Sequence, residues 1–191
     1  MTSPPLLSMR ERVVAAASAL TLEAGWAGLT MGKLADRVGV SRQTVYNEVG
    51  SKPQLAEEMV LAELAKFLAV VDAAFDERPD DLVEAIRLAS YGVLELARGN
   101  ALLQAVVSAS YGAETELLPL LTTRNDALVR TATIAVRRRV TAYPVDLDER
   151  HLDAAIDMVV RLVLSHVVHP VGDAADTADD IAWISGRTLR P

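Results

Sequence analysis

The chain has 191 residues, of which 51% are hydrophobic and 4% aromatic, and its formal net charge at pH 7 is −7. It contains no cysteine, which excludes a disulfide framework and a thiolate metal site. No apolar run approaches the about 18 residues of a membrane span, and the first residues lack the pattern of a signal peptide, so we expect a soluble cytoplasmic protein.

Composition and charge also predict the fold class and the domain organisation. Alanine, leucine and valine dominate without strand-like alternation, which predicts an all-α protein of about nine helices. Residues 1–52 contain six basic and four acidic side chains, a net charge of +2 that leaves −9 for the remainder. Such asymmetry is expected when one end meets a polyanion. We therefore expect a DNA-binding domain at residues 1–52 and a ligand-binding and dimerisation domain at residues 53–191.

The first predicted helix covers residues 8–24. Its apolar side chains recur at helical spacing, and the pattern stops at Gly25, a residue that favours a helix end. Trp26 and Leu29 follow in a short connection. Both are predicted to lie in the core. Large aromatic side chains are mostly buried, and for Trp26 contact with a partner is the alternative.

Two short helices joined by a tight turn are predicted at residues 31–38 and 41–49. The first carries its apolar residues on one face: Met31, Leu34, Ala35 and Val38. Thr30 can cap the first of these helices. Gly39 suits the left-handed position after a helix, and Ser41 is a good N-cap for the next. Helices joined this closely resemble a helix-turn-helix, whose second helix enters the DNA major groove. An ordinary helical corner with a solvated polar face is the alternative.

The second of these helices offers hydrogen-bonding side chains on the side away from Val45 and Val49. Arginine can pair with guanine and glutamine with adenine, so Arg42 and Gln43 are expected to contact bases. Tyr46 and Lys52 suit phosphates instead, as does Thr44. The sequence therefore predicts a recognition helix.

The same segment resembles the signature of the TetR family of bacterial transcriptional regulators over roughly residues 1–55. The motifs that carry the resemblance are Gly28-Leu29-Thr30, Leu34-Ala35, Gly39-Val40-Ser41, Thr44-Val45-Tyr46, and Ser51-Lys52 followed by Leu55. The chain departs from the family at Val49, where an aromatic residue is usual. The resemblance implies a TetR-like fold, binding to a palindromic operator, and a phosphate contact from the residue at position 30. The expected DNA-binding residues are Thr30, Ser41, Arg42, Gln43, Thr44, Tyr46, Asn47 and Lys52.

A long helix capped by Ser51 is predicted next, ending at the break in residues 78–81. The following expected helices span residues 82–98, 101–112 and 123–143, with a broken piece at 114–121. Three arginines, at residues 137–139, close the last of these. They either form a second nucleic-acid patch or complement the macrodipole at a solvated helix C-terminus.

Two C-terminal helices are predicted to bring the subunits together. Residues 148–168 are apolar on two sides of a helix, and a helix of that kind must be buried on both. A final helix is expected at residues 177–189. In the family that the chain resembles, two such helices build a four-helix dimer interface. The expected interface residues are Ile156, Val160, Leu164, Val167, Ile181 and Ile184.

The remaining candidates concern a metal and a ligand. His166 and His169 have a spacing that could hold zinc with a third ligand, but no acid lies at matching spacing, so we expect a hydrogen-bonded histidine and neither metal nor cofactor. The leucine-rich bundle predicts an apolar cavity for an acyl chain or alkane, with a closed core as the alternative. Its expected lining residues are Phe67, Tyr91, Leu94, Val107, Tyr111 and His166.

These patterns together predict a homodimeric repressor that a small apolar effector releases from a palindromic operator. No nucleophile with a base at suitable spacing and no glycine-rich phosphate loop appears, so we do not expect an enzyme. The alternative is a small α-helical enzyme or carrier that binds a lipid-like molecule and whose helix-turn-helix is incidental.

Overall fold

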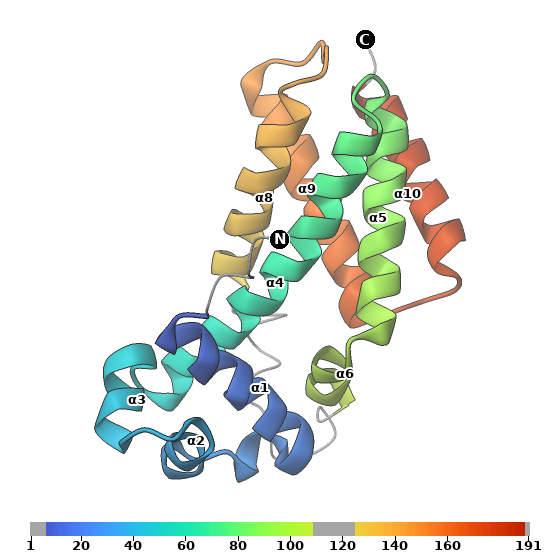
Figure 1. Cartoon of the computed structure of the whole chain (residues 1–191). Coiled ribbons are helices and arrows are strands. Elements are labelled where there is room, and N and C mark those ends of the chain that lie inside the picture. Colours follow the sequence, from blue (N-terminus) through green and yellow to red (C-terminus); the bar gives the residue numbers. More distant parts are fainter. Residues whose placement is uncertain (1–6, 109–124, 190–191) are drawn as a thin grey trace, which may run out of the picture. The chain divides into compact units, whose positions relative to one another are not determined.

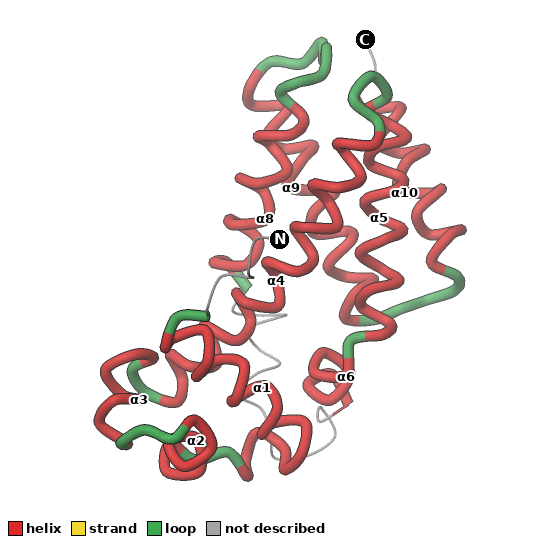
Figure 2. Tube along the Cα trace, in the orientation of Figure 1, coloured by secondary structure: helices red, strands yellow, loops and turns green. Residues whose placement is uncertain are grey.

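The computed structural model describes residues 7–108 and 125–189, which form nine α-helices and contain no strand (Figures 1 and 2). The helices are α1 (Met9–Gly28), α2 (Met31–Val38), α3 (Arg42–Val49), α4 (Lys52–Glu77), α5 (Leu82–Gly99), α6 (Ala101–Ser108), α8 (Asp126–Val140), α9 (Glu149–Val168) and α10 (Ala174–Leu189). The expected all-α class is confirmed. The predicted piece at 114–121 and Tyr111 lie outside the described residues. None of the described helices is long and apolar enough to cross a membrane.

The described residues divide into two compact units within the chain. The first holds residues 7–63 and 101–108, and the second holds residues 64–100 and 125–189, so α4 contributes to both. A boundary at residue 52 was expected from the sequence. The packing units divide later because the first turns of α4 place Leu55, Ala56 and Met59 in the core of the first unit.

Helix α1 illustrates how local sequence sets the helix ends in the first unit. Ser8 is its N-cap and forms a reciprocal capping box with Glu11, which satisfies two backbone donors. Gly25, expected to end the helix, has φ of 72° and interrupts the regular helix, after which one turn continues to Gly28. Trp26 and Leu29 are 4% and 1% exposed, so the prediction that both lie in the core is confirmed.

The second unit is built around α5 and α9. Helix α5 packs against α9 and α10, while α8 packs against α9. A Cβ atom built on Gly92 would lie 2.6 Å from Cγ1 of Val70. Glycine at this position therefore lets α4 and α5 approach more closely than any other residue would allow. The core of the unit comes from α4, α5, α8, α9 and α10 and includes Phe75, Ile86 and Ile156.

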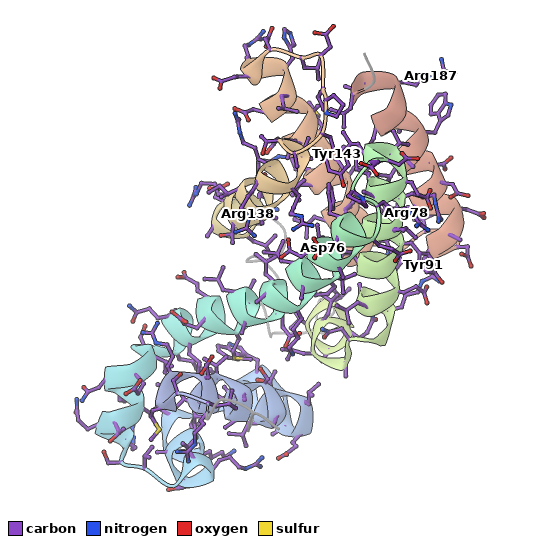
Figure 3. The ribbon with its side chains drawn as sticks, turned by 45° about the horizontal axis from the view of Figure 1, so that its top comes forward. Asp76, Arg78, Tyr91, Arg138, Tyr143 and Arg187 are labelled. Atoms are coloured by element: carbon purple, nitrogen blue, oxygen red, sulfur yellow. The ribbon has the colours of Figure 1, made fainter. Side chains whose placement is uncertain are left out.

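The end of α4 is held by the end of α8 and the residues that follow it. The Tyr143 hydroxyl donates to the carbonyl oxygens of Arg78 at 2.7 Å and Phe75 at 3.3 Å (Figure 3). Its ring meets the Phe75 ring edge to face, with centroids 5.9 Å apart. Burial raises the pKa of the Tyr143 phenol, which keeps this donor protonated.

The three arginines at the end of α8 pair with acids that are distant in sequence. Arg137 forms an ion pair with Asp153 of α9, and Arg139 forms one with Asp76 of α4. Arg138 lies 3.9 Å from Asp72 of α4 and is largely exposed. The cluster therefore joins three helices of one unit. The two alternatives considered from the sequence were a nucleic-acid patch and a solvated helix C-terminus, and neither included this role.

Candidate nucleic-acid interface

The turn between α2 and α3 has the geometry predicted for it. Gly39 adopts the left-handed conformation, with φ of 79° and ψ of 38°, and its N–H donates to the Ala35 carbonyl oxygen at 2.9 Å. The Ser41 hydroxyl accepts from the N–H of Thr44 at 3.0 Å and so caps α3. Three residues separate the two helices. The buried and small Ala35, at 2% exposure, lies on the packed face of α2.

Helix α3 has one buried and one exposed side. Val45 and Val49 are 0% and 3% exposed and belong to the core of the first unit. Val49 thus fills the position where an aromatic residue was expected from the family resemblance. The exposed residues of the helix are the polar ones expected to face DNA: Arg42, Gln43, Tyr46 and Asn47.

The polar side chains of α3 differ in whether they already form hydrogen bonds within the protein. Gln43 Nε2 donates to Asn47 Oδ1 at 2.9 Å, one helical turn away. Thr44 Oγ1 lies 2.9 Å from Ser41 Oγ. The side chains of Arg42 and Tyr46 have no hydrogen-bond or ion-pair partner among the described residues, and Tyr46 is 41% exposed. The side chains of Arg42 and Tyr46 are therefore unengaged, whereas those of Gln43 and Asn47 are bonded to each other.

Thr30 lies at the start of α2 and acts as its N-cap. Its hydroxyl accepts from the N–H of Lys33 at 3.2 Å, and the side chain is exposed. The capping role predicted from the sequence is confirmed. A hydroxyl that accepts from the backbone keeps its own proton for a second hydrogen bond, which a phosphate oxygen can accept.

Ion pairs and helix-end contacts that sequence reasoning missed hold the helix-turn-helix to α1. Arg37 of α2 donates two hydrogen bonds to Glu23 of α1, at 3.0 and 2.5 Å. The Arg37 guanidinium lowers the pKa of the Glu23 carboxyl, and the carboxylate raises the pKa of Arg37. Arg12 of α1 donates to the Val38 carbonyl oxygen at the end of α2, at 3.3 Å. No local spacing pattern relates residues this far apart, so these contacts could not be found from the sequence.

Lys52, expected to contact phosphate, has a different partner in the structure. Its Nζ donates to the carbonyl oxygen of Trp26 at 2.8 Å and lies 4.6 Å from the centroid of the Trp26 ring. Lys52 is half-buried. In this conformation the ammonium is bound to the end of α1.

The residues expected to line a ligand cavity are only partly brought together. In the second unit Leu94 is buried at 6% exposure and Phe67 is half-buried, but Tyr91 is 39% exposed at the surface of α5 (Figure 3). Val107 belongs to the first unit and is half-buried. His166 is half-buried, and its Nδ1 lies 2.9 Å from the Leu162 carbonyl oxygen.

The histidines occupy separate environments in the second unit. His151 Nδ1 lies 2.7 Å from Asp148 Oδ2, within the first turn of α9, and His169 is exposed. Within residues 7–108 and 125–189, no group of three or more histidine, aspartate or glutamate side chains could hold a metal ion. His166 makes a hydrogen bond within its own helix, as the sequence led us to expect of this residue.

The residues expected at a dimer interface fall into three groups. Ile156 and Ile181 are 2% and 1% exposed in the core of their own unit, which leaves almost no surface for a partner. The half-buried residues are Val160, Leu164 and Val167. Ile184 is 44% exposed. Two residues outside the expected interface set are more exposed, namely Met158 at 70% and Trp183 at 63%.

Comparison with known proteins identifies both halves of the chain. Residues 13–59 match the family model described as bacterial regulatory proteins, tetR family, and residues 81–187 match the one described as bacterial tetracyclin repressor, C-terminal domain. The chain is 29% identical over 175 residues to the HTH-type transcriptional regulator AlkX of Mycobacterium tuberculosis, which covers 91% of this chain and 82% of that protein.

Solved structures show the same fold over nearly the full length. The TetR family repressor AlkX from Dietzia sp., implicated in biodegradation of n-alkanes, has a TM-score of 0.77 at 24% identity and covers 98% of this chain and 100% of its own. The transcriptional repressor QsdR of R. erythropolis has a TM-score of 0.62 at 17% identity, with 94% and 93% covered. At these identities the likeness establishes the fold alone.

Proposed function

Because the chain belongs to the TetR family of bacterial transcriptional regulators, we propose that it is a dimeric repressor released from a palindromic operator by a small apolar effector. It is a DNA-binding transcriptional regulator, and proteins of this family bind operators as dimers. We propose in addition that the protein represses transcription, which of its residues contact DNA, and what kind of effector it binds. An enzymatic role is not proposed, since the family consists of regulators.

The exposed side of α3 is the observation that supports operator recognition. A stable helix needs its apolar side buried, and Val45 and Val49 meet this need. The opposite side then holds Arg42 and Gln43 in the first turn, where a recognition helix meets base edges. Because a two-fold dimer presents two such helices, the site should consist of inverted half-sites.

Footprinting upstream of the gene, followed by affinity measurements on the mapped site, tests this proposal. Arg42→Ala and Gln43→Ala should each lose about 1–3 kcal/mol of discrimination at particular base pairs, because each removes one bidentate base contact. Glu57→Gln, on the exposed side of α4, is the control. If all three variants, Arg42→Ala, Gln43→Ala and Tyr46→Ala, bind the operator with wild-type affinity, then α3 does not enter the major groove.

The effector is proposed to carry a long alkyl chain. The interior of the second unit is dominated by valine, leucine, isoleucine and alanine side chains, so a ligand there would meet mainly apolar surface. The likeness to a repressor implicated in biodegradation of n-alkanes makes alkanes and their oxidised derivatives the first compounds to test.

Release from DNA requires that effector binding and operator binding weaken each other through the protein. A hundredfold loss of operator affinity corresponds to about 2.7 kcal/mol of coupling, and the operator must weaken effector binding by the same factor. We propose that α4, which contributes to both units, transmits this coupling. Titration of a fatty acid or alkane with and without saturating operator measures it, and equal affinities would exclude that compound as the inducer.

A further inference from the structure

Helices α4 and α5 meet at a contact that leaves no room for a side chain on α5. A Cβ atom built on Gly92 would lie 2.6 Å from Cγ1 of Val70, and among the described residues Val70 supplies the one heavy atom of another helix within 4 Å of it. Carbon atoms in contact lie about 3.5–4.0 Å apart. To admit even a methyl group at position 92, the two helices would therefore have to separate by roughly 1 Å.

The Val70 side chain cannot easily make this room by itself. In a helix, valine strongly prefers one χ1 rotamer, because both of its γ-carbons are attached to Cβ. Val70 lies within α4, which is one uninterrupted helix. On the other side of the contact, α5 packs against α9 and α10 and places Ala89 and Val93 in the core. The element that would shift is therefore α4.

The C-terminal end of α4 is held in the second unit, so a shift at Val70 becomes a tilt of the helix. Phe75 is 3% exposed in the core of this unit, and Asp76 pairs with Arg139 of α8. Along the helix, Phe75 lies roughly 8 Å after Val70, and Lys52 lies roughly 27 Å before it. A tilt about Phe75 that moves Val70 by roughly 1 Å therefore moves the start of α4 by roughly 5 Å.

The start of α4 belongs to the unit that holds the recognition helix. Leu55, Ala56 and Met59 of α4 lie in the core of the first unit together with Val45 and Val49 of α3. Because they share this core, a displaced start of α4 carries α3 with it. A two-fold dimer reads half-sites at a fixed spacing, so a displacement of this size places the recognition helices out of register with the operator.

We propose that Gly92 is a positioning residue for operator recognition. The absence of a side chain at this position sets the tilt of α4 at which the two recognition helices of the dimer match the half-sites. Gly92 acts through Val70 and α4, at a contact that lies wholly within the second unit. The proposal deepens the proposed function and rests on it, because the tilt of α4 matters for operator binding only if α3 reads DNA.

Gly92→Ala in the full-length protein tests the proposal, with operator affinity as the first readout. We expect a loss of about tenfold or more, because a displaced recognition helix loses at least one base contact. The double variant Gly92→Ala/Val70→Ala should recover most of the affinity, since it removes the γ-carbon that the new methyl group would meet. Gly99→Ala is the matched control. It makes the same change at the end of α5, where a built Cβ has no described neighbour within 4 Å, and it should bind as wild type does.

The free protein supplies a second readout that needs no DNA. The chain contains no cysteine, so Glu57→Cys, on the exposed side of α4, places one spin label in each subunit. Pulsed electron spin resonance measures the distance between the two labels of a dimer. This distance should change by several ångströms in Gly92→Ala, return toward wild type in the double variant and stay unchanged in Gly99→Ala. A purely structural role of Gly92 would lower stability without moving the labels.

Either wild-type operator affinity or an unchanged label distance in folded Gly92→Ala would overturn the proposal. So would a loss of affinity that Val70→Ala does not relieve, because Gly92 would then act through something other than this contact. If Gly92→Ala does not fold, Val70→Ile enlarges the same contact from the α4 side by one methylene and replaces it in both measurements. Failure of the wild-type protein to bind any operator would instead refute the proposed function, and the label distances would still report whether Gly92 sets the tilt of α4.

Discussion

A single buried polar atom affects the stability of the fold according to whether it has a hydrogen-bond partner. Thr133 Oγ1 is the one buried side-chain oxygen or nitrogen without a hydrogen-bond partner in the part of the chain that the structure describes. Other helical hydroxyls donate to the carbonyl oxygen four residues earlier, as Thr21 does to Ala17 at 2.9 Å and Ser185 does to Ile181 at 2.7 Å. Thr133 therefore loses its bonds to water on folding without replacing them.

Thr133→Val should consequently leave the free energy of unfolding unchanged or raise it, by up to about 1 kcal/mol, because valine has the same shape and needs no hydrogen bond. Thr21→Val makes the same chemical change where the hydroxyl is bonded, and we expect it to destabilise the protein by about 1 kcal/mol. Urea unfolding of both variants compares them. Equal losses would mean that the Thr133 hydroxyl is bonded in solution.

The pair of Glu23 and Arg37 predicts a dependence of stability on pH. Hydrogen bonds from Arg37 lower the pKa of Glu23 below the ordinary value of 4.5. A carboxyl whose pKa is lower in the folded state stabilises the fold above its unfolded pKa, and this contribution disappears as the pH falls through the folded pKa. Glu23→Gln should therefore be less stable than wild type at neutral pH.

The difference between Glu23→Gln and wild type should shrink as the pH falls below 4.5, because protonation then removes the ion pair from wild type as well. Thermal unfolding at a series of pH values measures this. Glu57→Gln is the control, since Glu57 is exposed and has no ion-pair partner within residues 7–108 and 125–189. A pH-independent difference for Glu23→Gln would contradict the assignment.

Helix ends show which contacts are local and which are not. Thr30 and Ser41 cap α2 and α3 as expected, and Asp81 caps α5, because each of these side chains accepts from a backbone N–H three residues ahead. Ser51 behaves differently from the expected cap, since its backbone N–H and its hydroxyl both donate to Gln54 Oε1. At the C-terminal end of α4 the hydrogen-bond donor is the hydroxyl of Tyr143, a residue far along the chain.

Tyr143→Phe should destabilise the protein by about 1–2 kcal/mol, because it removes the hydroxyl that donates to the Phe75 and Arg78 carbonyl oxygens in a partly buried site. Chemical denaturation measures the loss, and operator affinity should change little while the protein remains folded. Tyr46→Phe is the matched control. Its hydroxyl is exposed, so stability should be unaffected while operator binding weakens. The reverse pattern would refute both assignments.

At the scale of the whole molecule, three exposed apolar side chains of the second unit are candidates for contact with a second subunit. Met158 of α9 and Trp183 and Ile184 of α10 are 70%, 63% and 44% exposed, on two helices that pack against each other. Large apolar side chains at this exposure are typical of interaction sites when they gather on neighbouring elements. We propose that these residues, and not Ile156 and Ile181, contact the partner.

Met158→Glu should give monomers at micromolar concentration and abolish binding to a two-half-site operator, because dimerisation would bury an unpaired charge. The isolated fold should survive, since the side chain is exposed. Ile134→Glu on α8 is the matched control, because Ile134 is also 70% exposed and should leave the dimer intact. Sedimentation of the two variants distinguishes them, and dimeric Met158→Glu would place the interface elsewhere.

The sequence by itself determined the helices, the turn at Gly39 and the buried side of α3, because each depends on residues within about one helical turn of each other. It also determined the exposed polar side of α3, since burial of Val45 and Val49 leaves the other side to solvent. Only the tertiary structure decided which contacts join distant residues. Lys52 could be assigned to Trp26, and Ile156 to the core of its own unit, only once helices far apart in the chain had been packed together.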